Sequence, residues 1–293
     1  MEGTIVKENY DGVTKRSLQA WKELKTFEPV EIFIYKNSTD AILQGFYKYK
    51  PNPYVLGLYD IHEVPHFIAK DKYGDEFRTS GLNCGYGGEG PRGTISILEQ
   101  LGIDNAERIV TGNSVIYIDM KNGTPKVEAG RSVFDDYLGD PMERTFESAR
   151  VYNYGERLVF TESNESRDTL GFLKFYLERV IDEVEAVYFL VDEDEILSYR
   201  RRAPMRYTDR IMDFPIAIRG KNGIEIWLKP YLFNSKRLEE QTIVKNVLEV
   251  VGFPPLNRDQ GILDKVKNTL SGKPIERPAV VIVESGQLEL HYL

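Results

Sequence analysis

The sequence predicts an α+β protein. We expect a strand-rich N-terminal domain, 1–150, with a mainly antiparallel sheet, few helices and a Gly-rich loop. An α/β C-terminal domain, 151–293, should contain about three helices. Hydrophobic residues are 41% of the chain and charged residues 29%, which is typical of a folded core. Short alternating segments crowd the first half, and long segments with helical spacing lie in the second.

The first half begins with one predicted helix and continues as strands. Leu18, Trp21 and Leu24 recur at helical spacing, and Pro29 ends that helix. A second helix is expected at 94–101, where Gly102 ends it. Turn residues separate the expected strands, which lie at 30–35, 41–49, 54–59, 66–70, 76–80, 115–120 and 126–129. Their close spacing favours antiparallel pairing.

The second half is expected to contain the longer helices. Apolar residues recur on one face of 168–184 and 235–251, and a third helix is expected at 259–270. A turn at 220–223 predicts a hairpin. The expected strands lie at 157–161, 186–191, 215–219, 224–229, 279–283 and 288–292. No internal repeat is apparent in the sequence.

Charge and cysteine content exclude several classes of protein. The net charge of −8 argues against broad nucleic-acid binding, which needs a basic surface, and is compatible with a partner that carries a basic groove. Cys84 is the one cysteine, so no intrachain disulfide forms and a reducing compartment is expected. The polar N-terminus and the lack of a long apolar run predict a cytoplasmic protein without a membrane span.

The most unusual segment is the glycine-rich stretch 81–93. A glycine loop before a helix can present backbone N–H groups to a phosphate. In that interpretation an anion or nucleotide is bound by Gly85, Gly87, Gly88, Gly90 and Arg92. No Gly-Lys-Ser/Thr follows, and Glu89 would repel a phosphate. These departures favour the alternative, a tight turn that packs the helix against the sheet.

A dense group of arginines lies in the second half. Arginine recognises phosphate or carboxylate with two parallel hydrogen bonds. The group is therefore a candidate surface for an acidic partner, and its members are Arg200, Arg201, Arg202, Arg206 and Arg210. Internal pairing with the acidic run 192–195 explains the same pattern equally well.

The remaining polar residues form no clear catalytic set. His62 and His66 have a spacing that suits a metal only on a helix, and Pro65 argues against one. Cys84 would need His62 or His66 as a base, and an inert buried thiol is favoured. The pair Asp135-Asp136 is expected in a solvated loop or cap. We therefore expect no catalytic residue, no metal and no cofactor.

The stretch 85–91, Gly-Tyr-Gly-Gly-Glu-Gly-Pro, resembles a short motif of uncharacterised bacterial and phage proteins, which have no known catalytic residues to transfer. The chain length and its Tyr-, Lys- and Glu-rich composition suggest a phage protein from a Bacillus-like host. Among such proteins the chain resembles the phage inhibitors of the Gabija defence system in general character, without a matched motif. That resemblance implies a non-enzymatic protein that assembles around a host nuclease complex and hinders its DNA binding.

Together these patterns predict a non-enzymatic protein-binding protein, a phage-type inhibitor that blocks a host nucleic-acid-processing complex in the host cytoplasm. A homo-oligomer is compatible with this interpretation. The alternative is a phosphate- or nucleotide-binding enzyme that uses the loop from Gly85 to Gly93, with Cys84 or His66 in its chemistry. Direct nucleic-acid binding through the arginines is the weakest hypothesis.

Overall fold

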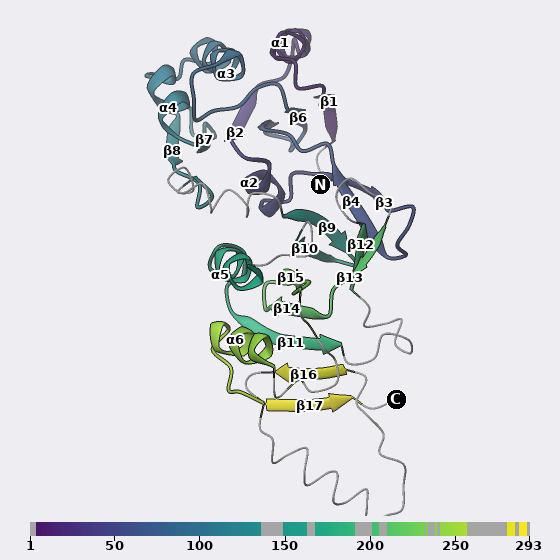
Figure 1. Ribbon diagram of the computed structural model, residues 1–293. Helices are drawn as coiled ribbons and strands as arrows, with labels where there is room; N and C mark the ends of the chain where they lie inside the picture. The colour runs from purple at the N-terminus through teal and green to yellow at the C-terminus, as the bar shows by residue number, and fades with distance from the viewer. Residues whose placement is uncertain are drawn as a thin grey trace, which may run out of the picture. The chain divides into compact units, whose positions relative to one another are not determined.

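The computed structural model (Figure 1) describes residues 4–135, 149–162, 168–190, 201–204, 210–231, 233, 238, 241–256, 280–284 and 287–291. The chain divides into two compact units. The first comprises Met1–Lys50 with Ile61–Asp140, and the second comprises Pro51–Asp60 with Pro141–Leu293. Both contain helices and a largely antiparallel sheet, which confirms the predicted α+β class.

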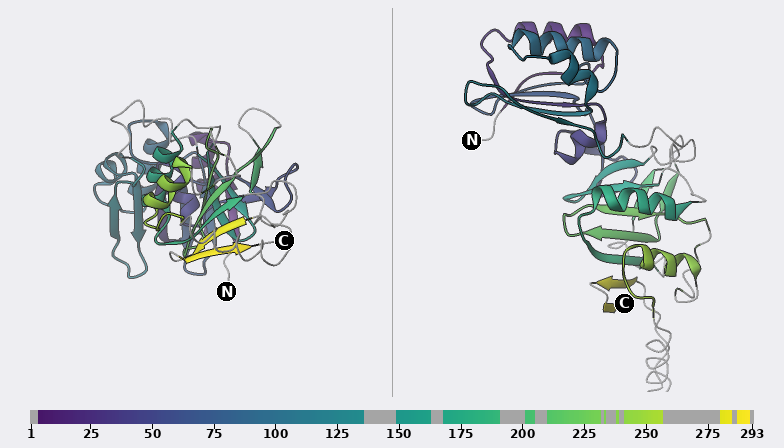
Figure 2. Two further views of the ribbon diagram at one scale, coloured as in Figure 1. Left: turned by 60° about the horizontal axis from the view of Figure 1, so that its bottom comes forward. Right: turned by 90° about the vertical axis from the view of Figure 1, so that its left-hand side faces the viewer.

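The first unit contains a six-stranded sheet. In spatial order its strands are β1 (Ile5–Asn9), β6 (Glu76–Thr79), β5 (Phe67–Asp71), β2 (Pro29–Tyr35), β7 (Val115–Asp119) and β8 (Lys126–Gly130). Only β1 and β6 are parallel neighbours. One face is covered by α1 (Thr14–Glu23), α3 (Glu89–Gln100) and α4 (Ala106–Gly112), and α2 (Ser38–Leu43) packs on the other (Figure 2).

The second sheet has nine strands. In spatial order they are β17 (Gln287–His291), β16 (Val280–Glu284), β11 (Val184–Leu190), β14 (Ile216–Gly220), β15 (Glu225–Leu228), β10 (Arg157–Thr161), β9 (Arg150–Tyr154), β4 (Leu58–His62) and β3 (Lys48–Pro51). Figure 2 shows α5 (Thr169–Val180) and α6 (Thr242–Val250) on one face. The hairpin of β12 (Arg202–Pro204) and β13 (Ile211–Asp213) packs on the other face.

Several sequence predictions need correction. The first half has four helices where few were expected. The expected strand 41–49 begins as helix α2, because Ala41 and Ile42 are buried on one side of a helical turn. Helix α3 begins at Glu89, five residues before the predicted start, so part of the glycine-rich segment is helical. In the second half α5 is confirmed, and of the helix expected at 235–251 the structure shows α6, which begins at Thr242 after the N-cap residue Gln241. The expected helix 259–270 lies outside the described residues.

The two units repeat one topology. The first sheet has the order β1-β6-β5-β2-β7-β8, and the second contains β10-β15-β14-β11-β16-β17 in the same order. Every pair of neighbours has the same relative direction in both, with one parallel pair, β1 with β6 and β10 with β15. Strands β9, β4 and β3 extend the second sheet beyond β10.

The repeat extends to local geometry. In the first unit the pairing of β2 with β5 shifts register between Pro29 and Glu31. The pairing of β11 with β14 shifts at the equivalent place, between Val184 and Ala186. The next hairpin turns match as well: Gly74 N donates to Asp71 O at 3.1 Å, and Gly223 N donates to Gly220 O at 3.0 Å.

Two short sequence matches lie at these equivalent places. The turn segments are Lys-Asp-Lys-Tyr-Gly-Asp-Glu at 70–76 and Arg-Gly-Lys-Asn-Gly-Ile-Glu at 219–225. The ends of α3 and α6 read Ile-Leu-Glu-Gln-Leu-Gly-Ile at 97–103 and Val-Leu-Glu-Val-Val-Gly-Phe at 247–253. Both helices close with the same pair of backbone hydrogen bonds around a left-handed glycine, Gly102 (φ 74°) or Gly252 (φ 77°). The sequence conceals the repeat because apolar residues exchange freely in cores.

Replacement of Gly102 or Gly252 by alanine should lower the free energy of unfolding by about 1 kcal/mol, because a Cβ is disfavoured in the left-handed region. Thermal unfolding of each variant would measure this loss. Gly112→Ala is the control, since Gly112 has no left-handed φ and open space around it. Equal midpoints for all three variants would contradict the prediction.

Candidate functional site

The glycines of the segment 81–93 are explained largely by close packing. A Cβ on Gly90 would lie 2.3 Å from Asn83 Oδ1, and one on Gly88 would lie 2.6 Å from the Tyr86 ring. Gly85 has a φ of 85°, and its Cβ would lie 2.6 Å from the Lys36 side chain. Gly87 has open space around it, and Arg92 is exposed. The contacts support the packing alternative, and anion binding stays a prediction.

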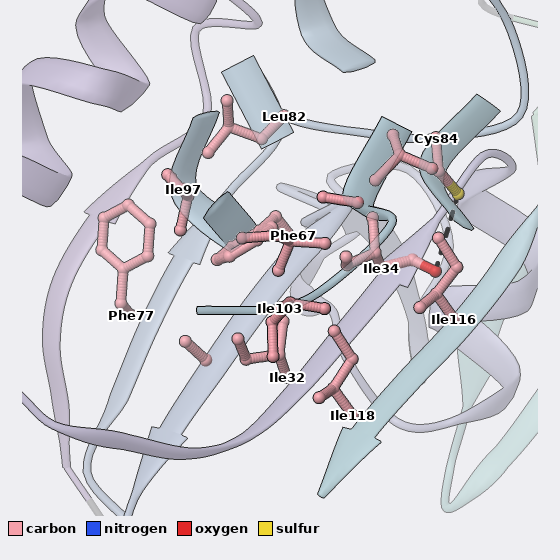
Figure 3. Packing of buried hydrophobic residues seen from close by; sticks show 14 of the residues in the cluster. Ile32, Ile34, Phe67, Phe77, Leu82, Cys84, Ile97, Ile103, Ile116 and Ile118 are labelled. Atoms are coloured by element: carbon pink, nitrogen blue, oxygen red, sulfur yellow. Dashed lines mark hydrogen bonds between the residues drawn. The ribbon is translucent and has the colours of Figure 1, made fainter. Parts of the chain in front are cut away.

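Cys84 lies in the helix-covered core of the first unit (Figure 3), fully buried beside Ile34 and Ile116. Its thiol donates to the Ile34 carbonyl, with Sγ and O 3.8 Å apart. Burial raises the pKa of Cys84 to about 12, so the thiol is protonated at neutral pH. The histidines bond elsewhere, since His66 Nε2 lies 3.0 Å from Ser38 Oγ and His62 Nδ1 lies 3.3 Å from Lys48 O. This geometry does not favour a thiolate nucleophile.

A polar cluster that sequence reasoning missed lies beside Gly85. Lys36 Nζ donates to Asp135 Oδ1 at 2.9 Å, and Ser132 Oγ donates to Asp40 Oδ1 at 2.8 Å. Burial raises the pKa of Asp40, whose Oδ2 has no partner. Asp135 is only 12% exposed, so its expected place in a solvated loop was wrong, and Asp136 lies outside the described residues. Lys36 and Asp135 are 99 residues apart, and no local pattern reveals their pairing.

This cluster connects segments that are distant in the sequence, which is a structural role. Its two pairs join the residues after β8 to Lys36, which follows β2, and to Asp40 in α2. Throughout the described part of the chain, no group of three or more His, Cys, Asp or Glu side chains is arranged to hold a metal ion.

The structure pairs Arg201 with Glu225, and the acidic run 192–195 lies outside the described residues. The Arg201 side chain is 5% exposed, and its Nε donates to Glu225 Oε2 at 3.0 Å. Arg219 Nε donates to Glu225 Oε1 at 3.0 Å, and Trp227 Nε1 donates to Oε2 at 2.8 Å. The Arg201 guanidinium also lies over the ring of Tyr154, 5.6 Å from its centroid. Arg201 is a core residue of the second unit.

The other arginines of the predicted group are more peripheral. Arg202 pairs with Asp213 at 2.9 Å across the β12–β13 hairpin, and both side chains are more than a third exposed. Arg210 is exposed, and Arg200 and Arg206 lie outside the described residues. A role in partner binding stays a prediction for these arginines.

Glu225 is the charged centre of the second unit. Its side chain is fully buried, which alone would raise its pKa, yet Arg201 and Arg219 hold the pKa below its usual value. Glu76 occupies the equivalent place in the first unit, where it pairs with Lys70 at 2.8 Å and with Arg78. In both hairpins, therefore, a buried glutamate forms an ion pair with a cation on the facing strand.

A second buried carboxyl lies where β10 ends. Glu162 is 2% exposed, and its Oε2 accepts the Lys229 N–H at 2.6 Å while Oε1 has no partner. Burial raises the pKa of Glu162 to about 7. No motif in the sequence distinguishes this residue.

The connection between β3 and β4 presents the most exposed apolar side chain of the described residues. Leu56 is 98% exposed, and Tyr54 is 58% exposed. Asn52 fixes the backbone beneath them, because its Oδ1 accepts the N–H groups of Tyr54 at 2.9 Å and Val55 at 3.0 Å. Val55 is buried in the core of the second unit. We call residues 52–57 the Leu56 loop; it joins β3 to β4 in Figure 1.

Comparisons with protein-family models, curated proteins and solved structures found no match to this chain. Among the helices that the structure describes, none has the length and apolar character needed to cross a membrane.

Replacing Glu225 with glutamine should destabilise the second unit by about 3 kcal/mol, because Arg201 would lose its buried counter-charge. Urea unfolding would measure the change. Glu183→Gln is the matched control, since it breaks the exposed pair with Lys221 and should leave the midpoint unchanged. A Glu225→Gln midpoint equal to that of the control would refute the role of this charge.

Glu162 should make stability fall as pH rises. Its native pKa of about 7 lies above the unfolded value of 4.5, so the native state holds the proton more tightly. The contribution of the protonated Glu162 carboxyl to the free energy of unfolding is fully present below pH 4.5. It is lost as pH rises to about 7, a change of about 3 kcal/mol. Unfolding of the wild type and of Glu162→Gln between pH 4.5 and 8 tests this. The free energy of unfolding of the variant should rise relative to that of the wild type as pH rises. A difference that stays constant with pH would disprove the raised pKa of Glu162.

Proposed function

We propose that this protein acts by binding another protein, with the Leu56 loop inserted into an apolar pocket of the partner. The observation that carries the proposal is the 98% exposure of Leu56 on a loop whose backbone Asn52 holds in place. A leucine gains about 1.5–3 kcal/mol when it is fully buried, and in the free protein this gain is not realised.

The rigidity of the loop supports this reading. Two backbone N–H groups bond to Asn52 Oδ1, Asn52 Nδ2 donates to Asp60 Oδ1 at 2.9 Å, and Val55 anchors the loop in the core. A segment that is ordered before binding loses little conformational entropy in the complex. Tyr54 adds an exposed aromatic side chain, of the type enriched at interfaces.

For the partner, we propose a host nucleic-acid-processing complex of anti-phage defence, which the bound protein blocks. The support is the resemblance of the sequence to phage inhibitors of the Gabija system and the net charge of −8. An acidic protein is steered electrostatically towards the basic surface on which such a complex binds DNA.

The alternative of a phosphate- or nucleotide-binding enzyme gains no support from the geometry. Gly85, Gly88 and Gly90 are accounted for by packing, and burial keeps the Cys84 thiol protonated. No second function is therefore proposed.

Leu56→Asp should weaken inhibition of DNA cleavage by a purified Gabija nuclease complex about 100-fold, because a carboxylate would enter an apolar pocket. The measurement is a titration of cleavage activity against the wild type and the variant. The fold should be unaffected, since Leu56 makes almost no contact with the rest of the chain.

Tyr73→Asp is the control for this experiment, because Tyr73 is also exposed, at 67%, but lies in the turn between β5 and β6. It should inhibit like the wild type. Equal inhibition by Leu56→Asp and the wild type would show that the Leu56 loop does not enter a pocket of the partner. No inhibition by the wild type would exclude the proposed partner.

A further inference from the structure

Strands β1 and β10 hold equivalent places in the two repeats. Each is the parallel neighbour of the strand that carries the buried glutamate, with Ile5 opposite Glu76 and Val159 opposite Glu225. The two strands differ at the edge that faces away from this neighbour, which we call the outer edge.

The outer edge of β10 is covered by β9. Five antiparallel residue pairs join them, from Arg157 with Tyr154 to Thr161 with Arg150. In contrast, β1 is the terminal strand of its sheet, and within the described ranges no strand pairs with its outer edge (Figure 1). The fold thus shows, in its second copy, what covers this edge.

The side chains of β1 protect this edge poorly. Ile5 is 36% exposed and Val6 is 43% exposed. Lys7 and Glu8 carry charges, but they pair within the chain, Lys7 with Glu23 at 2.7 Å and Glu8 with Lys48 at 2.5 Å. Strand β8, at the opposite margin of the sheet, also presents a paired lysine and glutamate, but these side chains are 73% and 58% exposed, against 40% for Lys7 and 38% for Glu8. Exposed charges are the usual protection of an edge strand against pairing.

A second copy of this chain fits the edge poorly. Symmetric antiparallel pairing places a residue opposite its own copy at the two-fold axis. Centring the pair on Lys7 or on Glu8 sets like charges directly opposite each other, which is destabilising. Centring it on Val6 uses the residue at the register irregularity between Ile5 and Lys7. Centring it on Ile5 sets Glu8 opposite Glu2 of the copy, and centring it on Asn9 sets β1 opposite residues beyond the end of the strand. The occupant is therefore a different polypeptide.

We infer that the outer edge of β1 binds an extended segment of another protein, which joins the sheet as an antiparallel strand. An aromatic residue opposite Ile5 is favoured, because Tyr152 lies opposite the equivalent Val159. This surface shares no residue with the Leu56 loop, so each can fail without the other.

The backbone shows how to block this edge. The Asn9 carbonyl accepts the Ser80 N–H at 3.0 Å, and the pairing from Lys7 to Asn9 is regular. Alternate residues of a strand bond to the same neighbour, so the N–H of Glu8 points away from β6. Proline at an edge strand is tolerated when the lost N–H faces solvent.

The test uses the full chain and a synthetic peptide of residues 149–155, Ala-Arg-Val-Tyr-Asn-Tyr-Gly, which contains β9. Binding is measured by fluorescence polarisation, and hydrogen exchange locates the amides that the peptide protects. Glu8→Pro removes the outward N–H, and Glu8→Ala is the matched control, since both variants lose the ion pair with Lys48.

The wild type and Glu8→Ala should bind the peptide with protection of the β1 amides, and Glu8→Pro should bind at least about ten-fold more weakly. Equal binding by Glu8→Pro and Glu8→Ala, protection at β10 alone, or no binding by the wild type would overturn the inference. A wild-type dimer that Glu8→Pro dissociates would overturn the choice of occupant. If Glu8→Pro does not fold, Val6→Lys is tested against the same outcomes, because a lysine protects an edge without removing an N–H.

Discussion

The pairing of one buried glutamate in each unit is the constraint on which both sheets depend. A carboxylate without a counter-charge is unstable in a protein interior, so Glu76 and Glu225 each require cations on neighbouring backbone. Lys70 and Arg219 meet this need from the opposite strand of each hairpin, and Arg201 adds a second cation in the second unit. Lys70 lies directly opposite Glu76 and Arg219 directly opposite Glu225, so each ion pair fits the observed register of its hairpin.

The repeat also explains where the exposed features lie. The Leu56 loop belongs to the connection between β2 and β5, although its residues are part of the second unit, and the arginine segment belongs to the equivalent connection between β11 and β14. In their described parts the two connections differ, since one contains α2, β3 and β4 and the other contains β12 and β13. A conserved framework with variable connections is the usual way in which one fold acquires different binding surfaces.

Two kinds of exposed surface support a role in protein binding. The Leu56 loop offers apolar side chains on a backbone held in place by Asn52, and the β1 edge offers unpaired backbone groups beside Ile5 and Val6. In the two proposals, the first surface would enter a side-chain pocket and the second would pair with an extended backbone. Two candidate residues from the sequence lie inside the fold: Cys84, considered as a nucleophile, is in the core of the first unit, and Arg201, considered for an acidic partner, pairs with Glu225.

The sequence by itself determined the α+β class, the amphipathic helices α1, α5 and α6, and the hairpin around Gly223, because these depend on local spacing and turn chemistry. Only the tertiary structure decided the partners of the charged residues, since Arg201 meets Glu225 and Lys36 meets Asp135 across long stretches of chain. It also revealed the repeat and the exposure of Leu56. Strand order and burial arise from contacts between distant residues, which no local pattern encodes.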